Sequence, residues 1–127
     1  MSVTVVWDNN EKTNILLSYQ GEWNETAYTA GQQQVKTMME SSTNKVNLII
    51  SIDYNVKVPA NAASRFRNAA RNPHANSGMV VLVGMNPFVR AIASIVMKLT
   101  GSQRMFMVST VDAARKLVET TQKPFEK

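Results

Sequence analysis

The sequence contains no cysteine, which excludes disulfide bonds, thiolate metal sites and cysteine nucleophiles. Its one histidine, His74, follows Pro73, whereas a metal site needs three or four ligands at short range. The five glycines form no phosphate-binding loop or nucleophile elbow, and the nine acidic residues include no pair spaced as acid–base partners. These absences predict a protein that is not an enzyme and that holds no metal or cofactor.

Long hydrophobic runs are also absent. The most apolar segment expected to be helical, residues 88–99, contains Arg90 and Lys98 and is shorter than the roughly 20 residues that cross a bilayer. The first seven residues, MSVTVVW, have neither the basic region nor the apolar core of a signal peptide. We therefore expect no transmembrane segment and a cytoplasmic location.

Positive charge exceeds negative charge, giving a formal net charge of +5. Most basic residues are scattered, and only a group of arginines and one histidine indicates a patch: Arg65, Arg67, Arg71, His74 and Arg90. This group fits either the solvated side of a helix or a basic face for a partner. Because no aromatic residues alternate with it to stack on bases, we expect no nucleic-acid binding.

The C-terminal half alternates short apolar runs with helical patterns. Residues 79–83 (MVVLV) precede the breakers at 84–87, a helical stripe from 88 to 99, a second apolar run at 105–108 and a helical segment at 111–118. This rhythm predicts parallel strands, because a crossover must return the chain before each next strand. Solidly apolar strands are typical of parallel sheets that are buried on both faces.

The N-terminal half begins with two alternating strands, residues 3–7 and 15–19, separated by the turn-forming segment 8–12. We expect an antiparallel hairpin, then a helix capped by Asn24 or Thr26, a strand at 46–53 and a helix that begins at Pro59. At 127 residues with 44% hydrophobic residues, the chain is expected to be one domain, residues 1–127. The predicted fold is α/β: a mixed sheet with an N-terminal antiparallel hairpin, mostly parallel core strands and about four helices.

This order of elements and two motifs resemble the STAS domain of bacterial anti-sigma factor antagonists. Residues 80–90 (VVLVGMNPFVR) are similar to the family's strand, "VG" turn and "P-x-V-R" helix, and residues 109–114 (STVDAA) to its last helix start. Residues 13–53 fit in length and pattern but carry no diagnostic residues. The resemblance implies a STAS-like domain that acts through protein–protein contacts.

The chain departs from the family at the regulatory site. Switching members carry a phosphorylatable serine after an aspartate at the start of the second helix, whereas residues 58–65 read VPANAASR here. The matching position is Ala60 or Asn61, and Ser64 lies a full turn further into the expected helix. We therefore expect no phosphorylation switch, as in divergent STAS-like proteins, some of which are related in shape to CRAL-TRIO lipid carriers.

A binding rim is expected where the parallel strands end and the following helices begin, because ligands of open α/β sheets bind at that edge. Helix N-termini there attract anions or acidic side chains. Helix capping alone also explains the asparagines and the threonine of this rim completely, and it is the interpretation we favour. The candidate rim residues are Asp53, Asn61, Gly84, Asn86 and Thr110.

The segment 87–99 carries two apolar stripes, although a surface helix needs only one. Phe88, Ile92, Ile95 and Leu99 have the spacing to pack on the sheet. The second stripe is the candidate partner surface, which neighbouring helices, a homodimer, a partner protein or a lipid tail would cover: Val89, Ala93, Val96 and Met97.

Taken together, the sequence predicts a non-catalytic regulatory protein–protein interaction module of the anti-sigma factor antagonist type, without a phosphorylation switch. Its partner would be a regulatory protein or a second copy of the chain. The alternative is a carrier of a small apolar ligand or lipid with a CRAL-TRIO-like shape, and the eight methionines suit its adaptable interior as well as an ordinary core.

Overall fold

The computed structural model describes residues 2–57, 64–65, 76–84, 86–100 and 105–122. In residues 88, 92, 95–97, 99–100 and 121–122 it describes the backbone and not the side chains. Five strands and three helices are described, in the order β1 (Ser2–Trp7), β2 (Asn14–Gln20), α1 (Glu25–Glu40), β3 (Val46–Ile52), β4 (Ser77–Val83), α3 (Pro87–Thr100), β5 (Met105–Val108) and α4 (Val111–Gln122).

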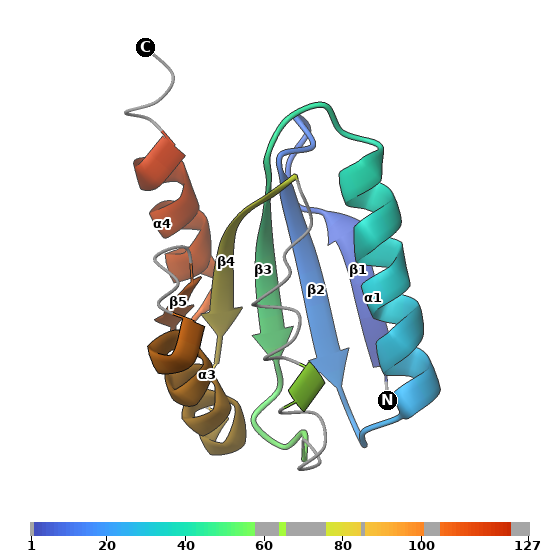
Figure 1. Ribbon diagram of the computed structural model, residues 1–127, viewed down its shortest axis with the longest axis vertical. Helices are drawn as coiled ribbons and strands as arrows, with labels where there is room; N and C mark the ends of the chain where they lie inside the picture. Colours follow the sequence, from blue (N-terminus) through green and yellow to red (C-terminus); the bar gives the residue numbers. More distant parts are fainter. Residues whose placement is uncertain (1, 58–63, 66–75, 85, 101–104, 123–127) are drawn as a thin grey trace.

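The five strands form one sheet in the order β1-β2-β3-β4-β5. β1 pairs antiparallel with β2, and every later pairing is parallel (Figure 1). The predicted α/β fold, its N-terminal hairpin and its parallel core strands are therefore confirmed. The number of helices differs from the expected four: three are described, and the helix expected from Pro59 lies outside the described residues except at Ser64 and Arg65, whose backbone is helical.

Helices cover the two faces of the sheet separately. On one face, α1 and Val89 of α3 pack on alternate residues of the strands, among them the fully buried Ile15 and Leu17. On the other face, α4 buries Ala114 and Val118 against Ile49 and the odd-numbered residues of β4. Both faces of β3 and β4 are thus covered, which explains their nearly continuous apolar sequences.

Two polar residues of the described strands are buried, Asn47 of β3 and Ser77 of β4. Asn47 of β3 is 6% exposed; its amide nitrogen donates to Oδ1 of Asn14 at 3.0 Å, and its Oδ1 accepts from the backbone N–H of Met79 at 2.9 Å. The side chain thus bridges β2 and β4 at a place where the β3–β4 register shifts. Because each of these polar atoms has a partner, burying Asn47 is tolerated.

None of the helices in the described part of the chain has the length and apolar character that crossing a membrane requires.

Candidate functional site

The carboxyl ends of β2, β3, β4 and β5 lie at one edge of the sheet, because these strands are parallel (Figure 1). We call this edge the rim and define it by the described residues that follow the strands: 21–24, 53–57, 84, 86 and 109–110. The rim is the place where the sequence predicted a binding site.

Asn86 connects two of these segments. Its side chain is 3% exposed, and its Nδ2 donates to the carbonyl oxygens of Asp53, Tyr54 and Val56 at 3.0, 3.2 and 2.8 Å. Its Oδ1 accepts from the N–H of Val89 at 3.3 Å, which caps the first turn of α3. The loop after β3 is therefore held in shape by a residue that precedes α3.

Gly84 allows the ends of three strands to approach closely. It has a φ of +122°, and a Cβ atom at this position would lie 2.9 Å from the carbonyl oxygen of Ile52. Its N–H donates to the carbonyl of Val108 at 3.0 Å. Any side chain here would be strained by the backbone conformation and would push β3 and β4 apart.

The structure brings most of the predicted rim residues to this edge but gives them structural roles. Thr110 Oγ1 accepts from the N–H of Ala113 at 3.1 Å and so caps α4. Asp53 is exposed, and its backbone bonds to Tyr19 and Val56. Asn61 lies outside the described residues. Asp53 therefore keeps a side chain in solvent, whereas the side chains of Asn86 and Thr110 are engaged in capping.

An aromatic cluster at the rim was missed by the sequence reasoning. Tyr19 at the end of β2, Trp23 in the following loop and Tyr28 in α1 have ring centroids 4.9 to 6.3 Å apart. The signal was present, since Trp23 lies within the Gly21–Asn24 segment and Tyr19 and Tyr28 lie on either side of it. Their contact depends on the turn at Gly21, where φ is +85°, and on the cap that Asn24 gives α1.

Charged and polar groups surround this cluster. The guanidinium carbon of Arg65 lies 5.6 Å from the ring centroid of Tyr28, within cation–π range, and Arg65 also pairs with Glu25. Trp23 Nε1 donates to Glu25 Oε1 at 2.9 Å. Arg65 therefore connects the segment after β3 to the first turn of α1.

The two tyrosines of the cluster are held neutral. Burial raises the pKa of Tyr19 well above its usual value, and the hydrogen bond that Gln32 Nε2 donates to its hydroxyl opposes this only in part. Burial also raises the pKa of Tyr28, while the charge of Arg65 acts in the opposite direction. Neither phenol is suited to act as a base near neutral pH.

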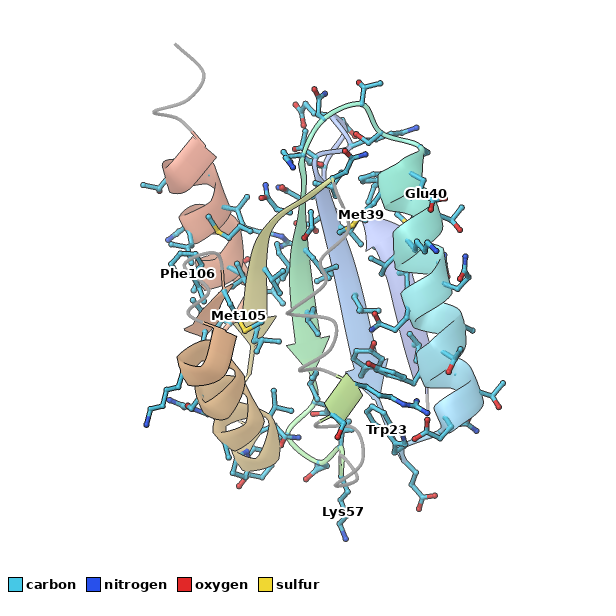
Figure 2. All side chains as sticks on the ribbon, viewed as in Figure 1. Trp23, Met39, Glu40, Lys57, Met105 and Phe106 are labelled. Carbon is cyan, nitrogen blue, oxygen red and sulfur yellow. The ribbon has the colours of Figure 1, made fainter. Side chains whose placement is uncertain are left out.

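The outer surface of the rim is exposed and partly aromatic. Tyr54 is 62% exposed, one of the largest exposures of a hydrophobic side chain among the described residues. Lys57 is exposed and Trp23 is half-buried, and Figure 2 shows both at the same end of the molecule. The described rim thus presents rings and charges of both signs, because Glu22 and Asp53 are also exposed.

The predicted partner surface on α3 is wrong for two of its four residues. Val89 is 8% exposed and belongs to the core beneath α1 and α3, and Ala93 is 3% exposed. The helix is rotated so that Val89 and Ala93 are buried within the chain instead of facing outward. The side chains of Val96 and Met97 lie outside the described residues.

Among the described residues, no group of three or more histidine, aspartate or glutamate side chains could hold a metal ion. Comparison with known proteins adds no family, because no protein-family model matches the chain and no curated protein is significantly similar to it.

Proposed function

We propose that this chain is a regulatory protein-interaction module that binds its partner through the rim. The STAS-like type of module, without a phosphorylation switch, is the form that its sequence resemblance implies. The observation that carries the proposal is the exposed Tyr54, on a loop held by Asn86, at the sheet edge that also carries Trp23 and Lys57.

Three features support a protein partner. Tyrosine, tryptophan and arginine are the residues most enriched where protein interfaces gain their binding energy. The buried hydrogen bonds of Asn86 fix the loop that carries Tyr54, so little conformational freedom is lost there on binding. Charges of both signs on the rim suit the mixed surface of another protein better than a uniformly charged polymer.

The proposed module has no phosphorylation switch, as the sequence predicts from residues 58–65. Ser64 is exposed and its backbone is helical. It remains the serine to examine, and phosphoproteomics of the native protein tests the prediction. Stoichiometric phosphate on Ser64, or on any residue from 51 to 64, would contradict it.

Site-specific photo-crosslinking tests the proposed interface. A photo-reactive phenylalanine analogue replaces Tyr54 in one sample and Thr43 in the control, in cells of the source organism. Thr43 is exposed in the loop between α1 and β3, at the other end of the strands. We expect a discrete adduct from position 54 and none from position 43.

The adduct's partner is then identified, purified and titrated against the wild-type chain and Tyr54→Ala. A side chain at the centre of an interface contributes enough binding energy for its loss to weaken affinity at least about tenfold. Because Tyr54 is exposed, the free energy of unfolding of the variant should differ from that of wild type by no more than about 0.5 kcal/mol. Equal adducts from both positions, or unchanged affinity of Tyr54→Ala, would refute binding through the rim.

Native mass spectrometry distinguishes the alternative carrier function. A mass above 14.1 kDa that is lost on denaturation would indicate a bound small molecule. A mass of twice that value would indicate self-association.

A further inference from the structure

The outer edge of β1 carries backbone groups that point away from the sheet. The N–H of Asp8 donates to the carbonyl of Asn14 at 2.8 Å, and the register continues as Val6 with Leu16 and Thr4 with Ser18. In an antiparallel pair, such hydrogen-bonded positions alternate with positions whose backbone groups point outward. The outward residues of β1 are therefore Val3, Val5 and Trp7.

One side chain already occupies this edge. Gln34 of α1 donates from its Nε2 to the carbonyl oxygen of Val5 at 3.3 Å. Within the part of the chain that the structure describes, no other hydrogen bond to the outward groups of β1 is found. The amide of Gln34 therefore stands where the N–H of an adjacent strand would donate.

The sequence of β1 lacks several of the usual features that prevent strand addition, although Gln34 and α1 lie against this edge. Proteins protect exposed edges with charged residues, prolines or bulges. β1 reads SVTVVW, without a charge or a proline, and pairs with β2 without a register shift. Val6, on the face opposite α1, is 45% exposed. β1 therefore offers an added strand regular backbone geometry and β-branched side chains for cross-strand pairing.

The position of α1 decides what can bind there. A Cβ atom at Gly31 would lie 2.7 Å from Cγ1 of Val3, so the helix backbone lies directly against β1. Figure 1 shows α1 beside β1 at the outer side of the sheet, away from the central strands. In a two-fold pairing of β1 with a second β1, the two α1 helices would share one face. Adjacent strands are about 4.8 Å apart, whereas packed helices need about 8–10 Å. A second copy is therefore disfavoured, and a single extended strand fits.

We propose that the outer edge of β1 binds one extended, uncharged peptide segment of a partner protein, which adds to the sheet beside α1. The backbone of Val3, Val5 and Trp7 supplies the hydrogen bonds. The near side of α1, which carries Gln34 and the half-buried Met38, forms the neighbouring wall. This surface lies at the opposite side of α1 from β3 and is separate from the proposed rim interface.

The probe is an acetylated Thr-Val-Thr-Val-Thr peptide with two C-terminal lysines for solubility, titrated into the labelled protein and followed by NMR. Its control has proline in place of the central threonine, which removes one donor and disfavours pairing. We expect amide exchange to slow at Val3, Val5 and Trp7. Thr4 and Val6 already donate to β2 and should change little.

Gln34→Ala tests the contact that distinguishes this edge. The substitution frees the carbonyl of Val5, so peptide affinity should rise about twofold to tenfold, the worth of one exchanged hydrogen bond. Gln33→Ala is the matched control, since Gln33 is the exposed neighbour on the same helix. Both variants should stay folded because alanine favours a helix.

The outcomes separate this proposal from the rim interface. Tyr54→Ala should leave peptide binding unchanged, so either surface can fail alone. Lack of protection at the three outward amides, or equal affinities of Gln34→Ala and Gln33→Ala, would overturn peptide addition. A dimer by sedimentation equilibrium whose interface protects the same amides would also overturn it, in favour of a second copy.

Discussion

Replacing Asn86 by aspartate is the sharpest test of how the rim is held together. The substitution keeps the size of the side chain and keeps an oxygen that can accept from Val89, so the cap of α3 is preserved. It removes the donor that serves the carbonyls of Asp53, Tyr54 and Val56. A carboxylate oxygen would then face three carbonyl oxygens inside a site that is 3% exposed.

The magnitude follows from these contacts. Leaving a buried polar group without its partner costs about 1–3 kcal/mol, and more for a charged group. We expect Asn86→Asp to lower the free energy of unfolding by about 3 kcal/mol at neutral pH. Asn86→Ala also removes the cap of α3, which contributes about 1 kcal/mol, but it introduces no charge. We expect it to lower the free energy of unfolding by about 2–4 kcal/mol.

The stability that Asn86→Asp loses relative to wild type, which we call its deficit, should depend on pH. Burial next to carbonyl oxygens disfavours the charged form, so the pKa of the introduced carboxyl is raised in the folded state above the value of about 3.9 in the unfolded chain. The deficit relative to wild type is therefore smallest below about pH 4 and grows as pH rises through the folded pKa. Equilibrium urea unfolding, followed by circular dichroism at several pH values, measures it.

Asn24→Asp is the matched control. Asn24 caps α1 through the same type of bond, accepting from the N–H of Ala27. It is exposed, and within the described part of the chain its side chain makes no hydrogen bond to the loop after β3. Aspartate is as good a cap as asparagine, so this control should change stability by no more than about 0.5 kcal/mol. If Asn86→Asp is as harmless as Asn24→Asp, the reasoning about the rim is refuted.

Three further predictions concern the sheet and its helices. Gly31→Ala should destabilise the fold by about 1–3 kcal/mol in thermal unfolding despite alanine's helix propensity, because its Cβ would lie 2.7 Å from Val3 Cγ1. Arg115→Ala should lose about 1 kcal/mol, and less at high salt, because it removes a two-pronged contact to the nearly buried Asp8 but is itself half exposed. In an alkaline titration followed by ultraviolet absorbance, Tyr19 should ionise well above pH 10, because burial raises its pKa. The stability that comes from burying the neutral phenol should therefore be fully present below about pH 10 and be lost as the pH rises further.

Each of these has a control on the same element. Gln33→Ala in α1 and Lys116→Ala in α4 change exposed residues and should shift the unfolding temperature little. Tyr19→Phe should remove the late phase of the alkaline titration. A neutral effect of Gly31→Ala, an equal effect of Arg115→Ala and Lys116→Ala, or a titration unchanged in Tyr19→Phe would each contradict the corresponding argument.

Much of the fold followed from local patterns. Alternation in residues 3–7 and 15–19 predicted the hairpin, because only one face of each of these two strands carries fully buried residues. The run at 79–83 predicted a parallel strand, since α4 covers one face and the core beneath α1 the other. Asn24 was one of two caps proposed for α1, and the structure selects it. Such features depend on neighbours in the chain, so a single sequence contains them.

The rotation of α3 could not be predicted in the same way. Two stripes of similar apolar character, one with Val89 and Ala93 and one with Phe88 and Ile92, are equally able to face a sheet. The side chains of the sheet beneath and the bond from Val89 to Asn86 place Val89 and Ala93 inward. The prediction of an exposed stripe was wrong at Val89 and Ala93 because periodicity gives the width of an apolar face and not its direction.

By itself, the sequence determined the type and order of the strands and helices, the cap of α1 and the edge at which loops would gather. These follow from hydrophobic period, breakers and the rule that parallel strands end together. Only the tertiary structure decided that Asn86 would bind the loop that carries Tyr54, that Arg65 would lie over Tyr28, and that Gln34 would reach the edge of β1. These contacts join residues that are 29 (Gln34 and Val5), 32 (Asn86 and Tyr54) and 37 (Arg65 and Tyr28) positions apart in the chain. Long-range packing fixes them, because each depends on where another element lies in space.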